Sequence, residues 1–360
     1  MRWIKSYLLP VALLFSLTAE TGHCSAHSIS WIFAHGPLDQ QVLGMMKKYA
    51  RLISEKSDST LKVDLKYFPE TQWESGRGWA YRWSDAFKKI SSGEIDIGQI
   101  ATDTLGTSTP ALDVMDLPFL FRDHDHVEKV LTGEIGKGLL AQIAASSGGR
   151  LHAFAFTYSG GFRVVASTKK ILTAEDFKAR STLDGTSYPR AAEYSYRMET
   201  LKAFGAKVVE LKEAIATLGT PETKKGLFSK GPIDTFIGPY KELLYEMKVP
   251  GVPKPKFITD DNLNLFTTVI VMREDSFQKL SPEQQKVLTA EIEKMAKEER
   301  VLFIRQAQEA KKQLIKKGLV ITSFNASERE KLEKLAAPVY AKFKEIPGGA
   351  ELIEKIKSVH

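Results

Sequence analysis

Strand-like and helix-like segments alternate along almost the whole chain, and this alternation limits the fold more than any other feature. The short segments are rich in β-branched and aromatic residues, and the longer ones repeat apolar residues at helical spacing. Strands linked by helices form βαβ units, so the sequence predicts an α/β fold with mainly parallel sheets. The predicted strands are 28–35, 61–67, 95–100, 151–156, 162–167, 207–210, 233–237 and 262–272, and the predicted helices are 40–56, one ending near residue 92, 123–144, 189–204, 223–230 and 281–317.

The same alternation restarts after residue 161, which predicts two α/β units, each with its own sheet. A chain of 360 residues is also longer than one ordinary core and suits two domains. Residues 158–161 (YSGG) lie between the two units. Paired glycines there suit a hinge, but they also suit a simple turn, which is the plainer interpretation.

One predicted helix is unusually long. Ser281 can cap its start, Pro282 suits its first position, and no breaker occurs before Lys317. At about 1.5 Å per residue it would extend roughly 54 Å, longer than either domain is wide. We expect it to bridge both domains, with a break near residues 297–299 as the alternative.

Residues 1–26 have the pattern of a signal peptide. Arg2 and Lys5 form a basic start, residues 7–18 are apolar but short for a membrane span, and residues 24–26 (CSA) end in small side chains. We therefore expect secretion to the periplasm. Acylation of Cys24 is the alternative, although residues 21–23 (TGH) lack the leucine that a lipoprotein site requires.

Composition excludes several classes of protein. The hydrophobic fraction of 43% excludes intrinsic disorder, and a single cysteine excludes a disulfide scaffold and a CxxC zinc site. The chain has 51 Lys and Arg against 44 Asp and Glu, a formal charge of +7. The basic residues are spread through the predicted helices, so we expect no nucleic-acid partner.

The sequence contains no recognisable catalytic or phosphate-binding motif. GxGxxG, GxxxxGK[ST], HExxH and GxSxG are all absent. His124 and His126 face different sides of a helix, so residues 123–126 (DHDH) indicate a solvated helix start with an acidic cap, not a metal site. We expect no enzyme, no catalytic residue, no metal and no cofactor. The profile instead suits a binding protein that closes on a ligand between its domains.

Residues 113–123 read DVMDLPFLFRD, a long and specific run. This run, with several shorter stretches, resembles the DctP-type solute-binding proteins of TRAP (tripartite ATP-independent periplasmic) transporters. The resemblance spans essentially the whole mature chain. The other matching stretches are GEIDIG at 93–98, GFR at 161–163, STKK at 167–170, TAEDFKAR at 173–180, AFGA at 203–206 and LSPEQQ at 280–285.

The resemblance implies a type II-like periplasmic binding protein with hinge strands and a long helix spanning both domains. The implied division is residues 27–158 plus 264–303 and residues 159–263 plus 304–360, with the ligand cleft between them. By position, Arg180 matches the arginine that holds the ligand carboxylate in the family, and Arg163 matches a second arginine that often contacts the ligand. Small and large TRAP membrane subunits are the implied partners, and the protein is expected to be a monomer.

Departures from the family pattern affect the expected site. The segments 184–196 and 218–225 are longer than the corresponding segments of the family. Gly238, two residues after Phe236, replaces an asparagine that helps to hold the acid in the family. Residues 72–83 are unusually aromatic and basic, so Trp73 and Trp79 are candidate ligand contacts. His35, at the end of the first predicted strand, is another candidate ligand contact. The alternative is that His35 caps a helix.

The leading hypothesis is therefore a periplasmic protein that captures an organic acid for a TRAP transporter, with Arg180 as anchor and Arg163 as support. A periplasmic sensor that presents a small molecule to a membrane receptor or kinase is the alternative. A secreted lyase or hydrolase lacks a paired base and nucleophile.

Overall fold

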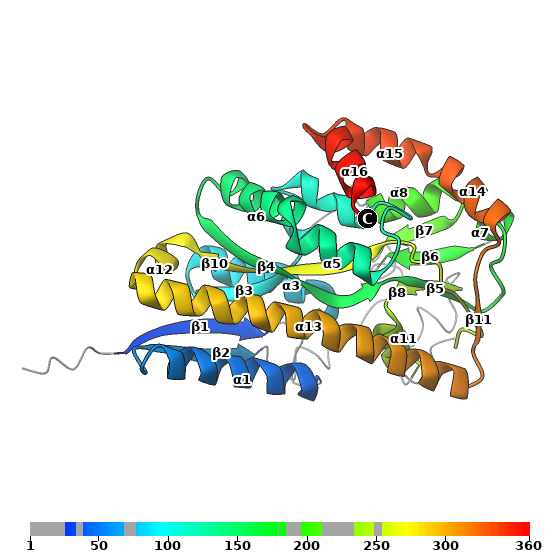
Figure 1. Ribbon diagram of the computed structural model, residues 1–360. Helices are drawn as coiled ribbons and strands as arrows, with labels where there is room; N and C mark the ends of the chain where they lie inside the picture. Colours follow the sequence, from blue (N-terminus) through cyan, green and yellow to red (C-terminus); the bar gives the residue numbers. More distant parts are fainter. Residues whose placement is uncertain are drawn as a thin grey trace, which may run out of the picture.

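The computed structural model describes residues 26–33, 39–67, 77–178, 180–184, 196–210, 234–247 and 254–360. Two sheets organise these residues (Figure 1). The predicted signal peptide, apart from Ala26, and the predicted helix 223–230 lie outside the described residues. The α/β fold with two domains is confirmed.

The first sheet has the strand order β2-β1-β3-β10-β4. The strands β1, β2 and β3 run parallel, and β10 runs antiparallel to both β3 and β4. The bounds are β1 His27–Phe33, β2 Leu61–Tyr67, β3 Ile97–Ala101, β4 Leu151–Phe162 and β10 Leu265–Arg273.

The second sheet has the order β11-β9-β5-β8-β6-β7. Here β5 runs antiparallel to β8 and β9, and the other pairs are parallel. The bounds are β5 Val164–Ser167, β6 Ser181–Asp184, β7 Lys207–Glu210, β8 Thr235–Gly238, β9 Phe257–Thr259 and β11 Val320–Thr322. Both sheets are thus mixed, and the prediction of mainly parallel sheets is wrong because β5 and β10, next to the crossings between sheets, run against their neighbours.

Helices connect and cover the strands. Their bounds are α1 Gln40–Lys56, α3 Arg77–Ser92, α4 Thr102–Leu105, η1 Pro110–Asp116, α5 His124–Thr132, α6 Glu134–Ser146, α7 Ala174–Lys178, α8 Tyr196–Ala203, α11 Tyr240–Glu246, α12 Glu274–Gln278, α13 Pro282–Lys316, α14 Ala326–Leu335, α15 Ala337–Lys344 and α16 Gly349–Ser358.

The predicted helix 123–144 is two helices, because the chain turns sharply at Gly133. Gly133 has extended backbone angles, φ −86° and ψ −167°, and ends α5. A Cβ on Gly136 would lie 1.9 Å from the carbonyl oxygen of Leu131, so α6 starts in direct contact with the end of α5. Apolar periodicity continues through both helices and does not reveal such a corner.

Residues 158–161 are not a turn, because β4 continues through them to Phe162. The β4–β10 pairing shifts register between Phe266 and Thr267, which forms a bulge at this point. Gly160 and Gly161 have φ of +125° and +75°, which explains the need for glycine. The strand therefore bends just before it crosses to the second sheet.

The long helix α13 is confirmed as one unbroken element of 35 residues. Ser281 and Gln284 form a capping box: the Gln284 N–H donates to Ser281 Oγ at 3.2 Å, and the Ser281 N–H donates to Gln284 Oε1 at 2.9 Å. Its first half packs in the core of the first sheet, and its last turns pack against the second sheet through Ala310 and Leu314 (Figure 1).

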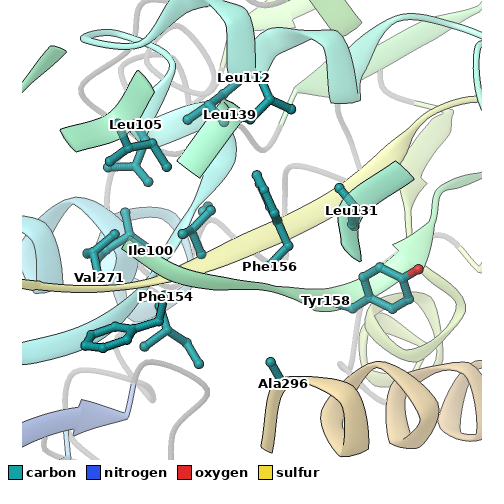
Figure 2. Close-up of a cluster of buried hydrophobic side chains, with 14 of the residues drawn as sticks. Ile100, Leu105, Leu112, Leu131, Leu139, Phe154, Phe156, Tyr158, Val271 and Ala296 are labelled. Carbon is teal, nitrogen blue, oxygen red and sulfur yellow. The ribbon is translucent and has the colours of Figure 1, made fainter. Parts of the chain in front are cut away.

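The described residues form three apolar clusters, the largest around the first sheet. Figure 2 shows part of it: Phe154, Phe156 and Tyr158 on β4, with Ala296 from α13 and with Leu131 and Leu139 from α5 and α6. This packing orients β4, whose end leads directly into the site described below.

The C-terminal helices contact both cores. Leu332 and Ala336 belong to the second-sheet cluster, whereas Phe343 and Ile353 belong to the first. The chain also crosses between the sheets at Arg163 and again at residues 260–264. The predicted division into residues 27–158 plus 264–303 and 159–263 plus 304–360 stays a prediction.

Candidate functional site

The two segments that cross between the sheets, at Arg163 and at residues 260–264, leave the first sheet at the same edge. The parallel strands β1, β2 and β3 all end there, Leu265 of β10 pairs with Phe162 of β4, and Thr268 pairs with Ala101 at the end of β3. Because carboxyl ends of parallel strands collect side chains for binding, this edge is the natural place to look for a site. Arg163 lies at this junction.

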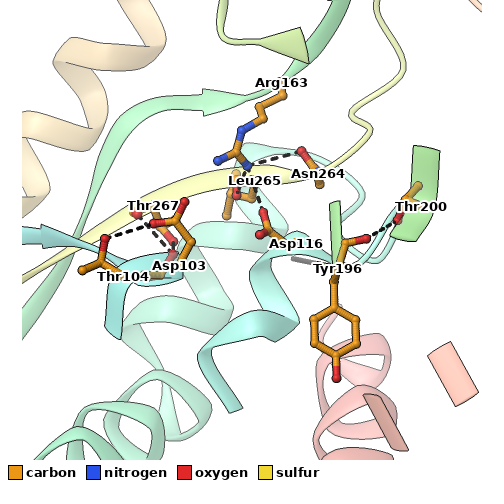
Figure 3. Close-up of polar contacts among 10 residues, drawn as sticks. Asp103, Thr104, Asp116, Arg163, Tyr196, Thr200, Asn264, Leu265 and Thr267 are labelled. Atoms are coloured by element: carbon orange, nitrogen blue, oxygen red, sulfur yellow. Dashed lines mark hydrogen bonds and ion pairs between the residues drawn. The ribbon is translucent and has the colours of Figure 1, made fainter. Parts of the chain in front are cut away.

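Arg163 is buried, with 2% of its surface exposed. Its Nη1 donates to Asp116 Oδ1 at 3.1 Å, to Asn264 Oδ1 at 3.3 Å and to the Leu265 carbonyl at 2.9 Å (Figure 3). The guanidinium carbon lies 4.3 Å from the centre of the Phe266 ring. The side chain is therefore held firmly between the two crossing segments.

Burial lowers the pKa of Arg163 to about 10. Repulsion from Arg197 lowers the pKa as well, whereas Asp116, Asp103 and Glu242 act in the opposite direction. A pKa of about 10 still leaves the guanidinium protonated at neutral pH. A buried cation at a domain junction is suited to bind an anion.

Arg180 is also buried, with 7% exposed, but its partners lie within the second sheet. Its Nη1 donates to Asp234 Oδ2 at 2.7 Å, and its Nε donates to the Asp176 carbonyl at 3.2 Å. Asp234 Oδ1 in turn accepts from the Ser181 N–H at 3.1 Å. This network ties the starts of β6 and β8 together.

The structure does not bring Arg163 and Arg180 together. β5 runs antiparallel to β8, with Val164 opposite Gly238, whereas β6 runs parallel to β8, with Thr182 opposite Thr235. Arg163 precedes β5 and Arg180 precedes β6, so the two arginines lie at opposite ends of β8. Extending the registers puts them six strand positions apart, or roughly 20 Å along the strand.

Phe236 and Gly238 form one local unit near Arg163. A Cβ on Gly238 would lie 2.5 Å from Cζ of the Phe236 ring and 3.3 Å from Glu242 Oε2. The space that a side chain at position 238 would need is thus occupied by the Phe236 ring. The half-buried Phe236 is packed with Val164 and Leu243 at this end of the sheet.

The remaining candidates cannot be placed as side chains. His35 and Trp73 lie outside the described residues, and the described part of α3 includes the backbone of Trp79 but not its side chain. Residues 185–195 and 211–233, which include most of the two longer segments, are outside it as well. Their contributions to a site stay predictions.

Three residues that the sequence did not single out belong to this site. Asp116 and Asn264 bond Arg163 directly, and the buried Arg197 on α8 is within electrostatic reach of it. One signal was available for Asp116. It lies inside an apolar run, VMDLPF, which suggests burial, and a buried charge needs a partner.

The described residues do not gather metal-binding side chains. Among them, no cluster of three or more His, Cys, Asp and Glu side chains is arranged to hold a metal ion. Asp123 caps α5 as expected, since its Oδ1 accepts from the His126 N–H at 2.8 Å, but His126 is buried, not solvated. No helix in the described ranges is long and apolar enough to cross a membrane.

The sequence matches the model of a known family over residues 33–346, which is most of the chain. The chain belongs to the bacterial extracellular solute-binding protein family 7, the DctP family. The expected family is thereby confirmed. The protein is thus a solute-binding protein of this family and not an enzyme.

Two curated relatives cover most of the chain. The 2,3-diketo-L-gulonate-binding periplasmic protein YiaO of Escherichia coli is 24% identical over 356 residues, 98% of each chain. The C4-dicarboxylate-binding protein DctB of Bacillus subtilis is 23% identical over 327 residues, 90% of this chain and 84% of DctB.

A crystal structure shares the fold. The TRAP periplasmic solute-binding protein of Xanthobacter autotrophicus Py2, with bound β-D-galacturonate, has a TM-score of 0.71 and 22% identity, covering 93% of this chain and 100% of that one. At this identity the likeness establishes the fold alone. The shared fold extends over 93% of this chain, and the described part includes the long helix α13, which contacts both sheets.

Proposed function

We propose that this protein is the periplasmic solute-binding subunit of a TRAP transporter and that it captures an organic acid through an arginine–carboxylate contact. The observation that carries this proposal is the buried, protonated Arg163 at the junction of the two domains. Relatives that bind 2,3-diketo-L-gulonate, C4-dicarboxylates and galacturonate support it, because all three ligands carry a carboxylate.

The proposed mechanism is non-covalent. The ligand enters between the open domains, its carboxylate pairs with an arginine, and the domains close around the crossing segments, residues 158–161 and 262–272. Closure excludes water and strengthens the ion pair. The closed, loaded protein then delivers the acid to the small and large membrane subunits, and it acts as a monomer.

The packing favours Arg163 over Arg180 as the anchor. The hydrogen bonds from the Arg163 side chain to described residues all use one nitrogen, whereas Arg180 uses both Nε and Nη1 to hold its own domain together. Arg163 also lies beside the crossings, and Arg180 lies at the other end of the second sheet. Arg180 remains the anchor that the family resemblance favours, so both are tested.

The test is isothermal titration calorimetry with 2,3-diketo-L-gulonate, succinate and D-galacturonate. We expect the wild type to bind at least one of them and Arg163→Lys to bind it about 100-fold more weakly, because lysine lacks the fork that grips a carboxylate. Arg180→Lys should bind within about threefold of the wild type. Loss of binding in Arg180→Lys but not in Arg163→Lys would return the anchor to Arg180.

Failure of the wild type to bind any carboxylate in a broader panel of sugar acids and keto acids would count against the capture of organic acids. Delivery to a transporter is tested separately. Purified membrane subunits reconstituted in vesicles should take up the bound acid only when this protein is added, and uptake that does not depend on it would contradict the proposal.

A further inference from the structure

Within the described part of the chain, the hydrogen bonds that hold the Arg163 side chain use one of its three nitrogens. Asp116, Asn264 and the Leu265 carbonyl all accept from Nη1, and the Phe266 ring covers one face of the guanidinium. Figure 3 shows these contacts converging on one end of the group. No partner in the described part of the chain bonds Nε or Nη2.

The unbonded nitrogens form a usable edge. Nε and Nη2 lie side by side in the guanidinium plane, spaced to donate two parallel hydrogen bonds to one carboxylate. Among the described residues Nε and Nη2 have no hydrogen-bond partner, and a buried cation is stabilised when a further group accepts from such nitrogens. The Nε–Nη2 edge is therefore the part of Arg163 that a ligand can take.

Asn264 has no other evident use for its side chain. It is 1% exposed, and its Nδ2 has no hydrogen-bond partner among the described residues, while its Oδ1 accepts from Arg163. The Arg163 N–H also donates to the Asn264 carbonyl at 2.9 Å. The amide is thus buried at the cost of an unsatisfied donor, with its oxygen turned to the guanidinium.

We propose that Asn264, with Asp116, is a positioning residue that holds Nη1 of Arg163 and so aims the Nε–Nη2 edge at the ligand carboxylate. This rests on the proposed function in one respect, that the ligand is a carboxylate. Arg163 and Asn264 stand on the two crossing segments, so the clamp spans both and orients the edge before the domains close. The anion-binding edge is then preformed, and closure adds contacts from the second domain.

A double-mutant cycle tests whether Asn264 acts through Arg163. Asn264→Leu preserves the size of the side chain but removes the acceptor, and it should weaken binding of the acid with the highest affinity in the calorimetric panel about tenfold. Combined with Arg163→Lys, it should add less than about twofold to the loss caused by Arg163→Lys alone. Additive losses would show that Asn264 acts independently, which would overturn the proposal.

The matched control is Thr109→Val. Thr109 is 2% exposed, and its Oγ1, like Asn264 Nδ2, has no partner in the described ranges. The substitution removes a buried polar group far along the chain from Arg163 and should leave affinity within about twofold of the wild type. An equal loss of affinity in Thr109→Val would show that any core change weakens binding, which contradicts a positioning role for Asn264.

A second measurement needs no ligand. In ¹⁵N NMR spectra, rotation of the Arg163 guanidinium about its Nε–Cζ bond should be about tenfold faster in Asn264→Leu than in the wild type, whereas Asn264→Asp, which keeps an acceptor oxygen, should stay close to the wild type. Unchanged rotation in Asn264→Leu would overturn the proposal. If no acid binds the wild type but rotation depends on residue 264 as expected, the clamp stands and the proposed function fails.

Discussion

Single side chains in this protein gain their roles from partners far away in the sequence. Asp116 is 47 residues from Arg163, and Asn264 is 101 residues from it. His124 is another example, because its half-buried ring packs near Tyr158 and Phe162, with centroid distances of 5.8 and 5.0 Å. Its ring lies against Gly161, where β4 bends before crossing to the second sheet.

Protonation of His124 should destabilise the folded protein. Burial lowers its pKa and outweighs Asp123, Asp125 and Asp260, which act to raise it, and its Nδ1 has no partner in the described part of the chain. A lowered histidine pKa means that the unfolded chain binds the proton more readily. Stability from this residue is therefore complete above about pH 6.5 and is lost as the pH falls through the lower folded-state pKa.

Thermal unfolding between pH 8 and pH 5 measures this effect. The midpoint of the wild type should fall more steeply below about pH 6.5 than that of His124→Gln, because glutamine does not titrate. His360→Gln, at the chain terminus, is the control and should follow the wild type. Parallel pH profiles for the wild type and His124→Gln would refute the assignment.

At the scale of elements, α13 is joined to the first domain by buried polar contacts as well as apolar packing. Glu299 Oε1 accepts from Gln99 Nε2 at 2.8 Å, and Gln99 also donates to Thr157 and Thr268 at 2.6 and 2.9 Å. On the next residue, Arg300 bonds Glu128 and the Phe156 carbonyl. The middle of the helix is thus tied to β4 and to α5.

Arg300→Met should destabilise the protein by about 3 kcal/mol, because it leaves the Phe156 carbonyl and Glu128 without their cation. Arg300 donates from Nε and Nη2 to Glu128 at 2.7 and 2.8 Å and from Nη1 to the Phe156 carbonyl at 2.6 Å. Urea denaturation gives the free energy of unfolding.

The control lies on the same helix. Lys312 forms an exposed pair with Glu309 at 2.9 Å, so Lys312→Met should change the free energy of unfolding by less than about 0.5 kcal/mol. Equal effects of the two substitutions would mean that Arg300 contributes no more than a surface charge.

For the whole molecule, the arrangement of the two domains depends on the crossings, on α13 and on contacts between helices of different domains. One such contact joins Asp39, which caps α1, to Lys241 on α11, and Gln306 of α13 bonds both residues. Beside it, α1, α11 and α13 line an open pocket of about 340 Å³, with Gln41 and Arg305 among the lining residues. This network ties the domains on the side of the long helix.

Lys241→Met should loosen the arrangement of the domains. Losing a partly exposed ion pair of this kind costs up to about 1 kcal/mol, which should raise the dissociation constant for the captured acid up to about fivefold. Small-angle X-ray scattering should give a larger radius of gyration for ligand-free Lys241→Met than for the wild type. Lys331→Met, which removes a pair within α14, should alter neither quantity, and an unchanged radius in Lys241→Met would contradict this role.

Local signals predicted some elements closely. The α1 helix and β2 occupy the predicted ranges, and Ser281 caps α13 as expected, because these features depend on neighbouring residues. The corner at Gly133 and the bulge at Gly160 were missed, since each forms where distant backbone packs closely. The candidate ligand contacts Trp73, Trp79 and His35 stay predictions.

The amino-acid sequence by itself determined the α/β alternation, the long helix and the family, because these follow from periodicity, capping and long matching motifs. Only the tertiary structure decided where the arginines stand. Arg163 and Arg180 both precede short strands of one sheet, and their sequence surroundings do not distinguish them. Their strands run in opposite directions beside β8, which leaves Arg163 at the junction of the domains and Arg180 at the far end. Strand direction is set by the path of the whole chain, and no local pattern encodes it.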